Sequence, residues 1–147
     1  MKAIVALVDF SDVSSNVLQQ VQTLAQAFKS HVTILHGVPM SHAVVDVGVA
    51  SPAVAQPPTP EAIQADLARL EKLTEPLRAA GVDLSLRQFH NTTVENIVKV
   101  ALQCEADVIV VGSHRHNSIY NLIVGSVTHD LLVRAKCPVL VVSTQAA

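Results

Sequence analysis

Short runs of β-forming apolar residues alternate along this chain with longer segments in which apolar side chains recur every three or four positions. The runs predict strands buried on both faces of a sheet, and the longer segments predict amphipathic helices. The predicted strands cover residues 3–8, 32–35, 84–89, 108–111 and 139–142. Strands separated by helices favour a single doubly wound, Rossmann-like α/β domain with a five-stranded, mostly parallel sheet and helices on both faces.

The first two helical segments carry recognisable start and stop signals. Polar residues at 11–14 supply N-capping groups for a helix that extends to about Lys29. A second helix is predicted over 61–80, where Pro76 indicates a kink or an early end and Gly81 a stop. The remaining helices are predicted over about 94–102, capped by Thr92 or Thr93, and over about 126–135.

The stretch 39–60 has a different composition from its surroundings. It consists of small apolar residues and ends in the proline-rich sequence SPAVAQPPTP. It is too short to form a domain of its own and predicts a mobile loop or lid between the second strand and the following helix. The whole chain, residues 1–147, is half apolar, which is enough to bury the core of one domain.

Composition narrows the possible functions. The net charge is −2, the ten Lys and Arg residues are scattered, and Trp is absent, so neither a basic stripe nor a base-stacking platform for nucleic acid is expected. Cys104 and Cys137 are too few for a disulfide framework and are interpreted as small buried apolar residues. Asp9 interrupts the apolar N-terminal stretch too early for a signal peptide or a membrane span. A cytoplasmic protein that is not embedded in a membrane is expected.

The segment from Val108 to Val142 carries the clearest functional pattern. An apolar strand ends on Gly112, a polar loop follows, and Gly125 and Ser126 open the last helix. Such a junction presents unpaired backbone N–H groups and the positive end of a helix to an anion. Ligands of doubly wound sheets bind at the carboxyl ends of strands, near the point where the strand order reverses. We therefore expect a phosphate-bearing small molecule near the ends of the first and fourth predicted strands.

Several motifs spread over the whole length carry a family resemblance. They are VDFS at 8–11, LH at 35–36, ADVIVVGSH at 106–114, GSVT at 125–128 and CPVLVV at 137–142. Together they resemble the universal stress proteins. Nucleotide-binding members of that family carry Gly, two residues, Gly, nine residues, Gly, and then Ser or Thr. Gly112 and Gly125-Ser126 match this pattern, whereas Arg115 stands at the middle glycine.

The resemblance implies ATP, with or without Mg²⁺, held between the end of the first strand and the glycine loop. Asp9 would contact the adenine or its neighbourhood, and the backbone at Gly37 would pass beside the ring. Gly112, His114 and Arg115 would border the ribose and phosphates. The full binding set implied by position is Val8, Asp9, Gly37, Gly112, Ser113, His114, Arg115, Gly125, Ser126, Val127 and Thr128, the last four offering N–H groups and hydroxyls to the phosphates.

Arg115 leaves two interpretations open. A glycine at this position would provide a positive φ or room for a phosphate to approach the backbone. The guanidinium could turn outward and grip the phosphates in a bidentate manner, replacing the backbone contact with charge. Alternatively, the side chain fills or distorts the site and the protein binds no nucleotide.

The resemblance also implies a homodimer, and the flat apolar run Val139–Val142 is the edge expected to pair; assembly beyond a dimer is left open.

Three functions follow as hypotheses. The first is a nucleotide-sensing regulatory protein of the stress response, in which occupancy changes loop order, oligomerisation or the binding of a regulatory partner. The second is a nucleotide-free dimeric scaffold.

The third hypothesis is a slow ATPase. The chain has no recognisable metal-binding carboxylate beside a phosphate-binding lysine, so efficient phosphoryl transfer is not expected, and no catalytic residue is assigned. His114 and His116 form an H-x-H pair without an identifiable third ligand, and no metal site is assigned either.

Overall fold

The structure is a computed structural model, which describes residues 1–38, 41–43, 54–90, 93–113 and 126–143. Strands and helices alternate along most of the chain, as the hydrophobic pattern predicts. In order, the elements are β1 (Ala3–Val8), α1 (Val13–Phe28), β2 (His31–Gly37), β3 (Ser41–Ala43), β4 (Val54–Gln56), α2 (Pro60–Ala79), β5 (Leu84–Phe89), α3 (Val94–Gln103), β6 (Val108–Ser113), α4 (Ser126–Arg134) and β7 (Val139–Ser143).

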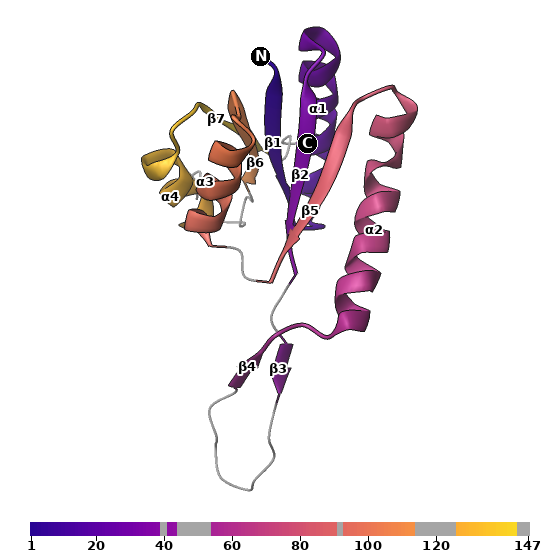
Figure 1. Ribbon diagram of the computed structural model, residues 1–147, viewed down its shortest axis with the longest axis vertical. Helices are drawn as coiled ribbons and strands as arrows, with labels where there is room; N and C mark the ends of the chain where they lie inside the picture. The colour runs from indigo at the N-terminus through magenta and orange to yellow at the C-terminus, as the bar shows by residue number, and fades with distance from the viewer. Residues whose placement is uncertain (39–40, 44–53, 91–92, 114–125, 144–147) are drawn as a thin grey trace, which may run out of the picture.

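All five predicted strands lie in one sheet, in the order β5-β2-β1-β6-β7 (Figure 1). Every neighbouring pair is parallel, and the central strands are in register with Val5 opposite Thr33 on one side and Ile109 on the other. The chain adds β2 and β5 on one side of β1, and β6 and β7 on the other side. The strand order therefore reverses between β1 and β6, and the predicted doubly wound α/β fold is confirmed.

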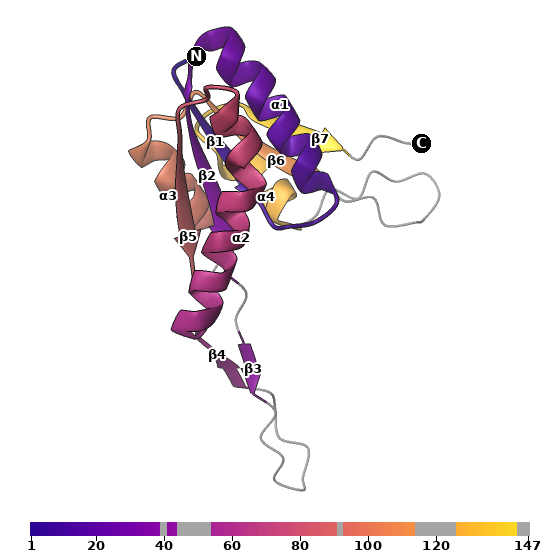
Figure 2. The same cartoon turned by 90° about the vertical axis from the view of Figure 1, so that its right-hand side faces the viewer.

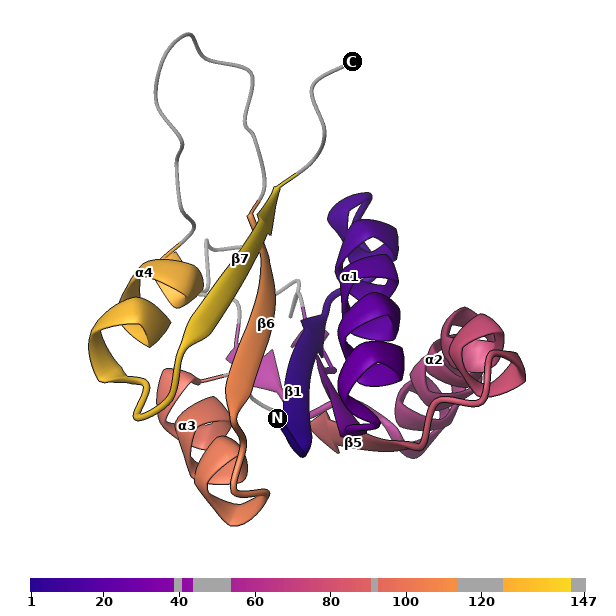
Figure 3. The same cartoon turned by 90° about the horizontal axis from the view of Figure 1, so that it is seen from above.

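Two helices cover each face of the sheet. Seen from above, α1 and α2 lie on one side of the strands and α3 and α4 on the other (Figure 3). Successive strand residues point to opposite faces of the sheet. On β1, Ile4 therefore packs in the core under α1 and α2, and Val5 packs in the core under α3 and α4. Both side chains are at most 1 % exposed, so the sheet is buried on both faces, which explains its continuous apolar strands.

The predicted capping of the first helix is wrong in its detail. Asp12, the residue before α1, has helical backbone angles and makes no side-chain cap. The hydroxyls of Ser11 and Ser14 donate instead to the carboxylate of Asp9, a charged acceptor close by in the chain. By contrast, Thr93 caps α3 as expected, since its Oγ1 accepts the backbone N–H of Asn96 at 3.2 Å.

Pro76 does not end the second helix, which continues to Ala79. Leu77, on the following position, is 3 % exposed and packs in the core, and this burial outweighs the single backbone hydrogen bond that a proline removes. Gly81 provides the predicted stop, with a φ of +79° that favours glycine. The N–H of Gly81 donates to the carbonyl of Arg78, and the N–H of Val82 donates to the carbonyl of Leu77.

The stretch 39–60, predicted as a mobile loop or lid, contains two short strands that the sequence did not predict. The described residues of this stretch include β3 and β4, which pair antiparallel with Ser41 opposite Gln56 and project away from the main sheet (Figures 1 and 2). Residues 39–40 and 44–53 lie outside the described part, and the predicted mobility stays a prediction. The stretch also supplies the start of α2, since Pro60 is its first residue and Thr59 its N-cap.

Strand β7 lies at one edge of the main sheet, with Leu140 37 % exposed, so an edge is present where the sequence predicts pairing between copies. The dimer itself stays a prediction.

Cys104 and Cys137 are free thiols but are only half-buried, less than the sequence interpretation expected. Among the helices in the described part of the chain, none combines the length and apolar character needed to cross a membrane.

Candidate functional site

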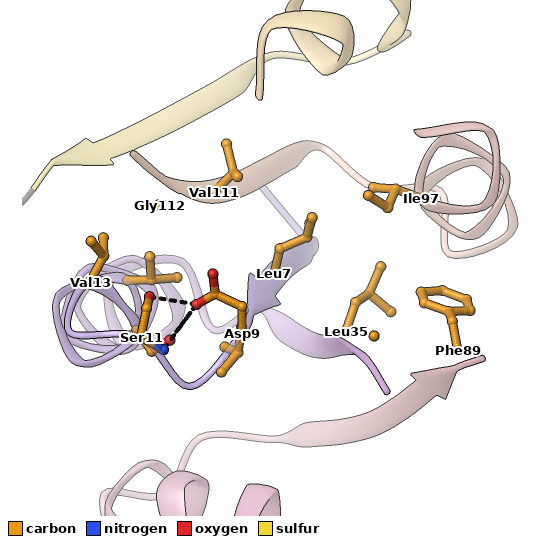
Figure 4. A pocket seen from close by; sticks show the side chains of 13 residues that line it. Leu7, Asp9, Ser11, Val13, Leu35, Phe89, Ile97, Val111 and Gly112 are labelled. Carbon is orange, nitrogen blue, oxygen red and sulfur yellow. Dashed lines mark hydrogen bonds between the residues drawn. The ribbon is translucent and has the colours of Figure 1, made fainter. Parts of the chain in front are cut away.

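A pocket of about 210 Å³ opens at the carboxyl ends of the central strands, where the strand order reverses (Figure 4). This is the position at which doubly wound sheets bind ligands. The pocket is bounded by β1 and its following loop, the first turns of α1 and α3, and the ends of β2, β5 and β6. Its lining residues are Leu7, Val8, Asp9, Ser11, Val13, Ser14, Val17, Leu35, Gly37, Phe89, Ile97, Val111 and Gly112.

Most of the pocket wall is apolar. Leu7, Leu35, Ile97 and Val111 lie around its interior, and the ring of Phe89 stands at the end of β5 (Figure 4). Pockets that enclose a whole drug-sized ligand usually measure roughly 300–1,000 Å³. The smaller volume here fits one flat ring system, and the rest of a larger ligand would lie outside the pocket.

Asp9 is the charged side chain of the pocket, and its position is fixed by the loop that follows β1. One carboxylate oxygen accepts the backbone N–H of Ser11 at 3.1 Å, the Ser11 hydroxyl at 2.5 Å and the Ser14 hydroxyl at 3.1 Å. These bonds hold the loop against the start of α1 (Figure 4). A hydrogen-bonding carboxylate is thereby placed beside an apolar cavity, as recognition of the polar edge of a ring requires.

Gly112 lines the pocket and is also required by the packing of α1 against β6. A Cβ on this residue would lie 2.7 Å from Cγ1 of Val13 and 3.2 Å from Cβ of Val13. Val13 is 1 % exposed, and its β-branched side chain is stiff at χ1, so it cannot easily turn away from the added atom. The first glycine of the sequence motif therefore permits a close approach of helix to strand, a reason that the sequence pattern alone did not reveal.

The first turn of α4 lies next to the end of β6. The hydroxyl of Thr128, which is 3 % exposed, donates to the carbonyl of Gly112 at 3.4 Å. Ser113, also buried at 1 % exposure, has a hydroxyl oxygen with no hydrogen-bond partner among the described residues. A buried hydroxyl without a partner is costly in a folded protein and is often satisfied by a ligand or a water molecule.

The structure brings together part of the binding set predicted from the sequence. Val8, Asp9, Gly37 and Gly112 line the pocket. Ser113, Val127 and Thr128 lie beside it rather than in its lining, with Val127 half-buried against the core under α3 and α4. Ser126 is the first residue of α4, and His114, Arg115 and Gly125 lie outside the described residues.

Sequence reasoning missed most of the apolar lining. Leu35 lies near the carboxyl end of β2 and Phe89 is the last residue of β5, whereas the sequence analysis expected the ligand near the first and fourth strands. Their position at the end of apolar runs was a usable signal. Ile97 gave no separate signal, because its spacing in α3 is that of any core residue. In the described part of the chain, no three His, Cys, Asp or Glu side chains come close enough together to hold a metal ion.

The fold is thus a doubly wound α/β domain with a pocket at the reversal point of its sheet. Sequence comparison gives the family: the profile of the Universal stress protein family matches residues 1–143. The chain belongs to the universal stress protein family, which confirms the resemblance drawn from the motifs.

Individual relatives agree with this assignment. A universal stress protein of Methanocaldococcus jannaschii is 28 % identical over 141 residues, covering 96 % of this chain and 81 % of the relative. A universal stress protein of Archaeoglobus fulgidus in complex with dAMP has a TM-score of 0.68 at 22 % identity, covering 97 % of both chains. A universal stress protein in complex with cAMP has a TM-score of 0.69 at 24 % identity, covering 98 % of both chains. At these identities, the two solved structures show the shared fold.

Proposed function

We propose that this protein binds an adenine nucleotide and acts as a cytoplasmic regulator whose occupancy alters loop order, oligomerisation or partner binding. The observation that carries the proposal is the apolar pocket at the reversal point of the sheet, with Asp9 fixed at its wall. The base would enter the pocket with its faces against Leu35 and Val111 and its polar edge toward Asp9. Two fold neighbours named for complexes with dAMP and cAMP support the choice of adenine.

The electrostatics around the pocket favour a phosphate-bearing ligand. The first turns of α1 and α3 line the pocket, and the first turn of α4 touches the carbonyl of Gly112. The amino ends of helices carry a partial positive charge and unpaired N–H groups. A ligand whose base fills the pocket would extend its phosphates toward the start of α4. The buried hydroxyl of Ser113 lies there and has no partner within the part of the chain that the structure describes.

ATP, with or without Mg²⁺, is the nucleotide that the glycine pattern implies, and Arg115 would then lie beside its phosphates. A nucleotide-free dimeric scaffold is the second candidate, favoured by the apolar edge strand β7 with its exposed Leu140. A slow ATPase has no support from a catalytic group among the residues that line the pocket.

Calorimetric titration with ATP tests the proposal, and a pair of tryptophan variants provides the control. Leu7→Trp places an indole, about as large as adenine, into the pocket from a half-buried position on β1. Val98→Trp makes a similar change in a pocket of about 230 Å³ at the other end of the sheet. We expect binding by the wild type and by Val98→Trp, and a loss of affinity of about tenfold or more in Leu7→Trp.

Thermal melts of the same proteins verify that each variant folds, and ATP should raise the melting temperature only of the variants that bind it. If the wild type shows neither heat of binding nor a thermal shift at millimolar ATP, the scaffold becomes the better account. If Leu7→Trp binds ATP like the wild type, the base does not occupy this pocket.

A further inference from the structure

His36 lies directly behind the wall of the pocket and is almost fully buried, with 2 % of its surface exposed. It is the penultimate residue of β2, and the next residue, Gly37, lines the pocket. In the sheet it is paired with Val8, the last residue of β1, which also lines the pocket. A buried imidazole at this position must satisfy both of its ring nitrogens within the protein.

Both ring nitrogens of His36 face hydrogen-bond acceptors. Nδ1 lies 2.7 Å from the carbonyl oxygen of Val8, and Nε2 lies 3.3 Å from a carboxylate oxygen of Asp66 on α2. A neutral imidazole has one N–H group and can donate to only one of these acceptors. With Asp66 ionised, the two bonds exist together only when the ring carries both protons, as an imidazolium paired with the carboxylate.

Contacts among three side chains connect the same region to α2. The ring of Phe10 lies 4.2 Å from the ring of His36, and the guanidinium of Arg69 lies 4.2 Å from the centre of the Phe10 ring. Phe10 has a φ of 60°, which is uncommon for a residue with a bulky side chain. These contacts hold Phe10 in that conformation, and with it the loop that begins at Asp9.

We propose that His36 is a positioning residue of the nucleotide pocket, acting as an imidazolium that joins the Val8 carbonyl to Asp66 of α2. The inference rests on the proposed nucleotide binding. The Val8 carbonyl belongs to the peptide that leads into Asp9, so its orientation sets how Asp9 faces the pocket. When the ring loses one proton, one of these two hydrogen bonds is lost. The ring then no longer holds either the Val8–Asp9 peptide or α2.

The charged groups around His36 determine the direction of the effect. Among the described residues, α2 contributes Asp66 and Arg69, the loop after β1 contributes Asp9, and the paired position on β5 is the neutral Gln88. Asp66 bonds the ring directly, whereas Arg69 is separated from it by the Phe10 ring. Because only the doubly protonated ring can donate both hydrogen bonds, nucleotide affinity should fall as the pH rises and that ring loses a proton.

The test compares ATP affinity at pH 5.5 and pH 8 in the wild type, His36→Gln and Asp66→Asn. His31→Gln is the matched control, because His31 lies on the same strand and also pairs with an aspartate, Asp83, but is 43 % exposed at the other end of β2. Since a phosphate group of ATP also titrates in this range, the measured quantity is the ratio of variant to wild-type affinity at each pH.

At pH 5.5 we expect His36→Gln to bind about fivefold to tenfold more weakly than the wild type, consistent with the loss of one buried hydrogen bond. At pH 8 this difference should be smaller, because deprotonation of the ring removes the same bond from the wild type. Asp66→Asn should lose ATP affinity in the same way as His36→Gln. His31→Gln should have the same ATP affinity as the wild type at both pH values. If His36→Gln has wild-type affinity at both pH values, or is weakened equally at both, the inference is overturned while nucleotide binding stands.

A second measurement does not depend on nucleotide or on the folding of the variants. In ¹⁵N–¹H spectra of the wild-type protein at pH 5.5, His36 should show two slowly exchanging ring N–H signals. A single ring N–H signal would mean a neutral tautomer and would overturn the inference. If the wild type gives the two signals but binds no ATP at either pH, the proposed function fails, and with it the role of His36 in nucleotide affinity.

Discussion

Two pockets of nearly equal volume lie at opposite ends of the parallel sheet, and they differ in what surrounds them. The pocket at the carboxyl ends of the strands measures about 210 Å³, and the amino-end pocket, beside Val98, Ile109 and Cys137, about 230 Å³. The first is bordered by the starts of helices, whereas the second is lined by residues at the carboxyl end of α3. Volume alone would not choose between them.

The difference in helix ends decides which pocket suits an anionic ligand. Helix starts present N–H groups and partial positive charge, and helix ends present carbonyls and partial negative charge. At the amino-end pocket, burial raises the pKa of the Cys137 thiol, so that the sulfur is held as a neutral group. The helix ends therefore favour a phosphate-bearing molecule at the carboxyl-end pocket. The order of strands and helices, which places helix starts at one end of the sheet, distinguishes the two pockets better than their volumes do.

The largest expected effect concerns the close packing that shapes the carboxyl-end pocket. Gly112→Ala should lower the free energy of unfolding by roughly 1–3 kcal/mol, because the added Cβ would meet the side chain of Val13. Urea unfolding measures this loss. In the double variant Val13→Ala/Gly112→Ala the clash is relieved, so its loss should be smaller than the sum of the two single losses. Wild-type stability in Gly112→Ala would show that α1 can move away from β6 at little cost.

The sequence was sufficient to predict the sheet and some of the residues that line the pocket. Continuous β-branched runs such as Val108–Val111 indicate strands buried on both faces, and that pattern is determined by the sheet's environment. Asp9 could be expected near the carboxyl end of the sheet because it directly follows an apolar strand, and it lines the pocket there. Leu35 and Phe89 could be predicted as strand ends but not as pocket lining, because that depends on which strands become neighbours.

Other features required the three-dimensional contacts. The role of Gly112 depends on the distance between β6 and Val13 on α1, which are far apart in the sequence. The hydroxyls of Ser11 and Ser14 looked like helix caps, but the carboxylate of Asp9 is a stronger acceptor for them. The partner of His36 comes from α2, and no local pattern indicates that Asp66 would face β2.

The smallest expected effect concerns the amino end of the sheet. Asp107, just before β6, accepts the backbone N–H groups of Lys2 at 2.5 Å and Ala3 at 3.0 Å. These two hydrogen bonds, that of Lys2 first, lower the pKa of the Asp107 carboxyl below its ordinary value. The folded-state pKa is lowered, so the stabilisation is present above about pH 4 and is lost as the pH falls through the lowered pKa.

Asp107→Asn should therefore destabilise the protein slightly at pH 7, and its difference from the wild type should shrink toward pH 3. Urea unfolding of both proteins across this range measures the difference. A difference that does not vary with pH would contradict the proposed contribution of the carboxylate charge. Nucleotide affinity at pH 7 should not change, because Asp107 lies at the amino end of β6, away from the carboxyl-end pocket.

Methyl NMR with ATP tests the central claim most directly, because it observes both pockets in one experiment. The protein is labelled at the methyl groups of Ile, Leu and Val and titrated with ATP. The signals of Leu7, Leu35 and Ile97 should shift as the base enters the carboxyl-end pocket, while those of Val98 and Leu102 at the amino-end pocket should not. Shifts confined to Val98 and Leu102, or no shifts at saturating ATP, would contradict the account.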